Sequence, residues 1–147
     1  GDCHRIGNFY LSSTVPGSAL HAIDKAESDG HRFLAQHMQG VAIYSLDDIV
    51  ELGIPFPNHI KIDVDGAEIQ IVQHMRKVLY DPRLRSVVIE IDEDISRGVI
   101  EETFLIAGFT EVSRERWAGK SVVNVLFARS PEAIIASGEK CSVQVGN

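Results

Sequence analysis

The chain has 147 residues, which is enough for one domain with a buried core. Its 14 Lys and Arg against 21 Asp and Glu give a net charge of −7. This acidity argues against a nucleic-acid partner, because phosphate binding needs a basic face. No apolar run approaches the roughly 18 residues of a membrane span, and the first residues lack a signal-peptide pattern. We therefore expect a cytoplasmic protein without a membrane segment.

The first part of the chain predicts two strands and one short helix. The expected elements are strands at 8–12 and 41–44, a polar stretch at 20–40 that forms a weak helix or an excursion, and a helix at 46–52. Ser45 has the residue type of an N-cap, and Asp47 and Asp48 lie in the first turn, where the helix dipole favours negative charge. Gly53 is expected to end this helix.

The rest of the chain alternates strands and helices and then changes pattern. The expected elements are strands at 59–64 and 86–91, helices at 66–79 and 96–107, and a hairpin of strands at 109–113 and 121–128. The strand 86–91 is apolar at most positions, which predicts burial on both faces, as in a parallel sheet covered by helices. Gly108 is placed to stop the second helix.

Strand–helix alternation followed by a hairpin indicates an open α/β sheet whose last strand runs antiparallel. We therefore expect a Rossmann-like sheet, mostly parallel, with a C-terminal antiparallel hairpin. The class I methyltransferase sheet ends in this way, and many other doubly wound folds share the alternation. Residues 1–130 would form this domain, and residues 131–147 would form a tail.

The most specific pattern is the nonapeptide from Ile60 to Glu68, I-K-I-D-V-D-G-A-E. It resembles the I-K-I-D-V-E-G-A-E signature of the FkbM family, with Asp65 where Glu is usual. The segment Tyr44–Ile49 is similar to that family's T-L-D-D motif, and Val87–Ile91 is similar to its V-x-x-E strand. The resemblance implies an S-adenosylmethionine-dependent methyltransferase that methylates a hydroxyl of a sugar or secondary metabolite.

The resemblance lacks its front part. The family begins with a strand and a glycine-rich turn, D-x-G-A-N-x-G, and an acidic residue then ends the second strand; these N-terminal strands are missing here. In nucleotide-binding α/β folds such features approach the ligand and hold its ribose. We therefore expect this chain alone to bind the cofactor poorly.

The candidate site lies where two predicted strands end. Ligands of parallel sheets bind beyond the carboxyl ends of the strands, and Asp63, Asp65 and Glu90 stand at such ends. Asp63 and Glu90 are candidate catalytic residues, because a placed carboxylate can take a proton from a hydroxyl; Asp63 and Asp65 are candidate cofactor contacts. The structural alternative pairs Lys61 with Glu90 and uses both aspartates to cap the following helix.

Two other functions remain open. Asp63-Val64-Asp65 also matches the D-x-D pattern with which many glycosyltransferases hold a divalent metal and a nucleotide sugar, although the six histidines show no zinc-site spacing. A truncated, non-catalytic domain that serves as a scaffold or as one half of a homodimer is the third hypothesis.

Overall fold

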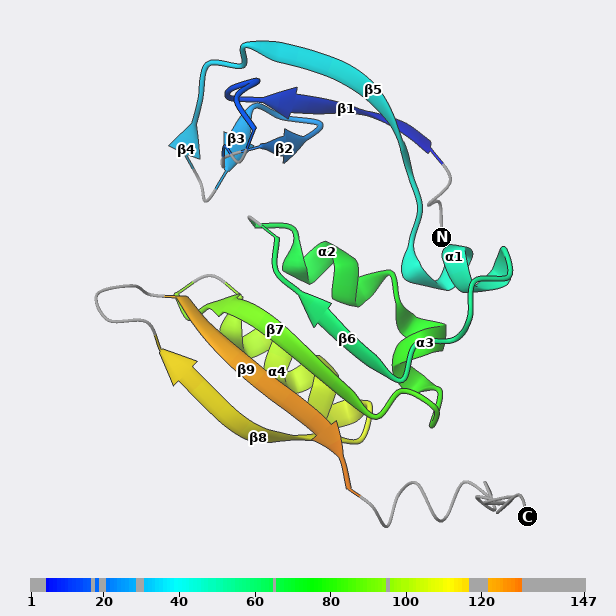
Figure 1. Ribbon diagram of the computed structural model, residues 1–147. Helices are drawn as coiled ribbons and strands as arrows, with labels where there is room; N and C mark the ends of the chain where they lie inside the picture. Colours follow the sequence, from blue (N-terminus) through cyan, green and yellow to red (C-terminus); the bar gives the residue numbers. More distant parts are fainter. Residues whose placement is uncertain are drawn as a thin grey trace, which may run out of the picture.

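The computed structural model describes residues 5–16, 18, 21–28, 31–64, 66–94, 96–116 and 122–130, so the tail expected at 131–147 lies outside the described residues. The strands are β1 Arg5–Leu11, β2 Ala22–Ile23, β3 Glu27–Ser28, β4 His31–Arg32, β5 His37–Ile43, β6 His59–Ile62, β7 Ser86–Asp92, β8 Phe109–Arg116 and β9 Val122–Arg129. The helices are α1 Leu46–Glu51, α2 Glu68–Gln73, α3 Arg76–Tyr80 and α4 Arg97–Ile106. The strands form three sheets, ordered β2-β1-β5, β3-β4 and β6-β7-β9-β8 (Figure 1).

The N-terminal strands pair with one another and form a small antiparallel sheet. β1 runs antiparallel to β5 over its whole length, with Arg5 opposite Ile43 and Leu11 opposite His37. The polar stretch 20–40 supplies the short strands β2, β3 and β4 and no helix among its described residues, so there is no crossover element that could make β1 and β5 parallel. This sheet contributes no side chain to the buried hydrophobic core of the described residues.

The larger sheet corrects the expected fold class. β6 is parallel to β7, but β9 lies between β7 and β8 and is antiparallel to both. Of the six strand pairings among the described residues, only β6–β7 is parallel. The expected mostly parallel, Rossmann-like sheet is therefore wrong. The expected hairpin is confirmed as β8–β9.

Helices cover one face of the larger sheet. Alternate residues of the central strands point into the core that α2, α3 and α4 close; these are Val87, Ile89 and Ile91 of β7 and Val123, Val125 and Phe127 of β9. Within this core Phe104 of α4 stacks on Phe127, with ring centroids 4.5 Å apart. The intervening residues of β7 are half-buried, so the expected burial on both faces is wrong: the other face of the sheet carries no described helix (Figure 1).

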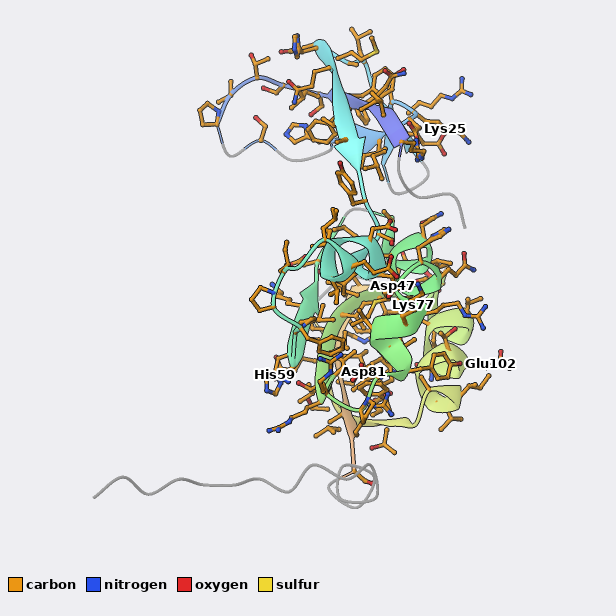
Figure 2. The ribbon with its side chains drawn as sticks, turned by 90° about the vertical axis from the view of Figure 1, so that its right-hand side faces the viewer. Lys25, Asp47, His59, Lys77, Asp81 and Glu102 are labelled. Atoms are coloured by element: carbon orange, nitrogen blue, oxygen red, sulfur yellow. The ribbon has the colours of Figure 1, made fainter. Side chains whose placement is uncertain are left out.

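The helix expected at 66–79 is divided into α2 and α3, which are separated by His74 and Met75. The reason lies on α1, since both carboxylate oxygens of Asp47 accept backbone hydrogen bonds, from Lys77 N and Val78 N, each at 2.9 Å. These amides are in the first turn of α3, where no i−4 carbonyl is available to them. Figure 2 shows Asp47 beside Lys77. The aspartate therefore caps a helix 30 residues away.

The predicted helix ends are confirmed. Ser45 forms a capping box with Asp48: its hydroxyl accepts from Asp48 N at 3.1 Å, and Asp48 Oδ2 accepts from Ser45 N at 2.9 Å. Gly53 and Gly108 have positive φ of 97° and 85°, a conformation that glycine adopts without strain from a Cβ.

Candidate functional site

The carboxyl ends of β6 and β7 lie side by side. Their parallel register pairs Lys61 with Val88 and Ile62 with Ile89, and continuing it by one residue places Asp63 beside Glu90. Glu90 alternates with the buried residues of β7 and so projects from the face on which the described residues place no helix. The register thus sets the ends of β6 and β7 side by side, and the proximity of Asp63 and Glu90 stays a prediction.

Lys61 is bound to Asp63 on this face. The Lys61 Nζ to Asp63 Oδ2 distance is 2.6 Å, and the two side chains are 63% and 50% exposed. The hydrogen bond that Lys61 donates to Asp63 raises the pKa of Lys61 above its usual value, and Glu90 adds a smaller Coulombic contribution. Lys61 is in solvent because β6 is an edge strand of the described sheet. Its ion pair is with Asp63, while Glu90, the partner that the structural alternative named, contributes electrostatically.

The turn after β6 is closed by Glu68. This glutamate is 8% exposed, and its Oε1 accepts from Gly66 N at 3.2 Å, while Gly66 has a positive φ of 89°. The helix α2 begins at Glu68 without a side-chain cap, so the alternative in which Asp63 caps the helix is wrong. Asp65 lies outside the described residues. Glu68 therefore holds the turn, in keeping with a structural role.

A row of polar side chains crosses the open face at the height of Glu90. The register places Asn124 of β9 directly beside Glu90, and Glu115 of β8 beside Asn124. With Asp63 at one edge, the row carries three carboxyl groups and one amide, whereas the next row is Lys61, Val88, Leu126 and Ser113. Sequence reasoning missed Asn124, although a lone polar residue in the run Val-Val-Asn-Val-Leu was a visible signal.

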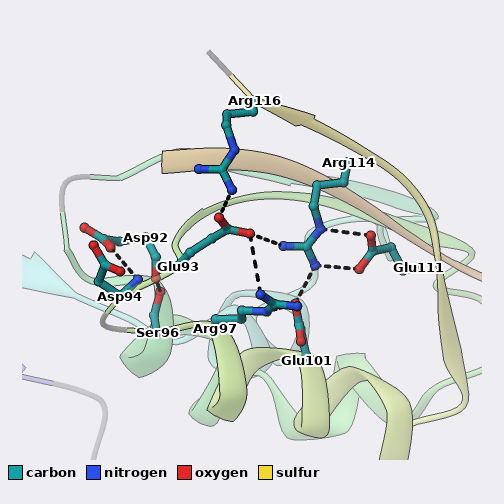
Figure 3. A network of polar contacts seen from close by, with 9 residues as sticks. All are labelled: Asp92, Glu93, Asp94, Ser96, Arg97, Glu101, Glu111, Arg114 and Arg116. Atoms are coloured by element: carbon teal, nitrogen blue, oxygen red, sulfur yellow. Dashed lines mark hydrogen bonds and ion pairs between the residues drawn. The ribbon is translucent and has the colours of Figure 1, made fainter. Parts of the chain in front are cut away.

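The turn after β7 is fastened on the other side of the sheet (Figure 3). Glu93, only 15% exposed, accepts from Arg114 at 2.8 Å and also from Arg116. Arg114 in addition binds Glu111 of β8 at 2.6 Å and Glu101 of α4. The hydrogen bonds that Arg114 donates to Glu111 and Glu101 raise the pKa of Arg114 further above its already high value, and the bond to Glu111 lowers the pKa of that glutamate. The end of β7 is therefore held against the edge of the sheet.

Asp92 also contributes to this turn. Its Oδ1 accepts from Asp94 N at 2.9 Å, and its backbone carbonyl accepts from Ser96 N and Ser96 Oγ at 2.9 and 3.1 Å. Ser96 is 3% exposed and precedes the first residue of α4. These local bonds fix the direction in which the chain leaves the carboxyl end of β7, next to Glu90.

The acidic row does not form a metal-binding group among the described residues. Among the described residues no group of three or more His, Cys, Asp and Glu side chains could hold a metal ion. The chemistry that the row offers is that of carboxylates: accepting hydrogen bonds from hydroxyl or ammonium groups, and taking up a proton.

Comparison with protein-family models, with curated proteins and with solved structures finds no match to this chain. Within the described part of the chain, no helix is both long enough and apolar enough to cross a membrane.

Proposed function

We propose that this chain carries the carboxylate side of the active site of an S-adenosylmethionine-dependent methyltransferase that methylates a hydroxyl of a sugar or secondary metabolite. The observation that supports the proposal best is the position of Asp63. Asp63 follows the last residue of β6, which is parallel to β7, and one further step of that register would set it beside Glu90, on a face where the described residues place no helix. A cytoplasmic location is part of the proposal.

The residues described here do not fit the whole cofactor. A methyl donor of this size needs a glycine-rich turn and a cleft, and the chain has no D-x-G-A-N-x-G turn. The structure has one groove beside β3 and β4 and another between α2, α3 and α4, and neither is lined by Asp63 or Glu90. The proposal therefore assigns only one wall of the site to this chain, and we derive no reaction step through the cofactor.

Asp63 and Glu90 have different parts in the proposal. Asp63 is exposed at the edge of the sheet and is held by Lys61, so it suits a contact to a bound molecule. Glu90 lies on a central strand, half-buried between Asp63 and Asn124. A carboxyl group whose surroundings are fixed on both sides is the better candidate for accepting a hydroxyl proton, because general-base catalysis depends first on geometry.

The metal-dependent glycosyltransferase alternative stays a hypothesis, because Asp65, the second aspartate of its D-x-D pattern, lies outside the described residues. The non-catalytic alternative is favoured by one observation, the ion pair in which Lys61 already occupies Asp63. The methyltransferase and scaffold hypotheses differ in what Asp63 does: in a scaffold it is a surface ion pair, and in an enzyme it contacts a ligand.

Calorimetric titration of S-adenosylmethionine separates these hypotheses. The protein from the complete coding sequence should bind the cofactor, and the 147-residue chain should bind it at least tenfold more weakly. Asp63→Asn in the complete protein should weaken binding, whereas Glu115→Gln, which removes a carboxylate from the far end of the same row, should not. Equal binding by the complete protein and the chain, or by the wild type and Asp63→Asn, would contradict the proposal.

A further inference from the structure

A groove on the helical side of the molecule is separate from the acidic row. It encloses about 510 Å³ between α2, α3 and α4. Val72 and Leu79 form its apolar floor, at 2% and 0% exposure, and Tyr80 and Ile106 stand on its rim, at 47% and 66% exposure. Exposed apolar side chains that are grouped around a hollow indicate a binding surface more strongly than scattered ones.

One cation that lines this groove has no partner among the described residues. Arg76, the first residue of α3, lines the groove, and among the residues that the structure describes its guanidinium has no ion pair or hydrogen bond. Its neighbour in sequence differs, since Lys77 is paired with Glu51. In a chain with a net charge of −7, an arginine without an internal carboxylate is available to an anion from outside.

We infer that this groove binds an amphiphilic organic anion, a molecule with an apolar body and one acidic group. The volume of about 510 Å³ falls within the range of about 300–1,000 Å³ that is typical of small-molecule sites. The apolar body would lie on Val72 and Leu79 between Tyr80 and Ile106, and the acidic group would meet Arg76. A guanidinium binds carboxylates and sulfonates through two parallel N–H donors, which favours one orientation of such a ligand.

The inference does not depend on the proposed methyltransferase function. The groove lies against the helices that cover one face of the sheet, whereas Asp63 and Glu90 project from the other face. A mutation that abolishes anion binding in the groove should leave cofactor binding unchanged, and the reverse should also hold, so the two proposals can fail separately.

Two dyes test the inference. The probes are 8-anilinonaphthalene-1-sulfonate, which carries one acidic group, and N-phenyl-1-naphthylamine, which has the same rings without it. Fluorescence titration should show one tight site for the sulfonate dye. Arg76→Gln should weaken the binding of the sulfonate dye at least fivefold and leave the binding of the neutral dye unchanged. The matched control is Arg85→Gln, an exposed arginine outside the groove, which should affect neither dye. Thr103→Trp, which fills the groove, should weaken both.

Three results would overturn the inference. Equal affinity of wild type and Arg76→Gln for the sulfonate dye would show that the cation does not recognise the ligand. An equal loss of affinity for both dyes in Arg76→Gln would show the same. Unchanged binding in a folded Thr103→Trp protein, with its circular dichroism and melting curve like the wild type, would place the dye elsewhere. A rise in dye affinity when the chain is ended after Ser130 would show that its own C-terminal segment is the occupant.

Discussion

Arg129 at the end of β9 connects the sheet to the ends of two helices. Its guanidinium donates to the carbonyls of Leu79 at 2.6 Å, of Ala107 at 2.7 Å and of Leu84 at 3.1 Å. Leu79 and Ala107 belong to the last turns of α3 and α4, whose carbonyls have no partner within the helix. The group also lies over the ring of Phe109, 4.3 Å from its centroid. One side chain therefore caps two helices at once.

Replacing Arg129 by Met should destabilise the protein by about 3 kcal/mol. Hydrogen bonds from a charged donor contribute about 1.5–3 kcal/mol each, and the two short bonds, to Leu79 and Ala107, give about 3 kcal/mol at the lower value. The third bond is longer, and its loss is offset because the half-buried guanidinium no longer has to be desolvated. That desolvation is also what lowers the pKa of Arg129 from its usual value.

Urea unfolding followed by far-ultraviolet circular dichroism measures this effect, provided that the slope against urea is the same in each variant. The matched control is Arg85→Met, an exposed arginine at the start of β7, which should change the unfolding free energy by less than about 0.5 kcal/mol. Arg129→Lys keeps the charge but loses the planar donors and should lie between the two, which preserves the test if Arg129→Met does not fold. A difference of under about 1 kcal/mol between Arg129→Met and Arg85→Met would refute the reasoning, because it would mean that water replaces the lost bonds.

Three further predictions use the same unfolding assay. Gly53→Ala should lower the unfolding free energy by about 1–2 kcal/mol from its positive φ alone, since a Cβ there meets no atom within 4 Å. Gly108→Ala should lower it more, since its Cβ would come within 3.1 Å of a side-chain nitrogen. Equal losses of unfolding free energy in the two variants would contradict this. Ser45→Ala should cost about 1 kcal/mol by removing the capping box, whereas Ser45→Asp should recover most of it. Arg114 holds the pKa of Glu111 below 4.5, so the stabilisation is present above about pH 4.5 and is lost as the pH falls through the lowered pKa. Glu111→Gln should therefore flatten the acid limb of stability against pH, and an unchanged limb would show that this ion pair does not contribute.

The sequence by itself determined the features that depend on neighbouring residues. Ser45 with Asp48, and the stops at Gly53 and Gly108, were recognisable because capping and positive φ are properties of a few consecutive residues. The hairpin β8–β9 was predictable because a short connection without a helix permits only antiparallel pairing.

Tertiary structure decided the features that join distant parts of the chain. These features are the pairing of β1 with β5, the cap that Asp47 places on α3, and the three hydrogen bonds from Arg129 to backbone carbonyls. They connect residues between 22 and 50 positions apart. Alternation of strands and helices is compatible with several pairings, and only the burial of one particular set of side chains selects among them. Tertiary packing also determined which face of the sheet carries Glu90. The sequence of a mostly apolar strand does not indicate which of its two sides the helices cover.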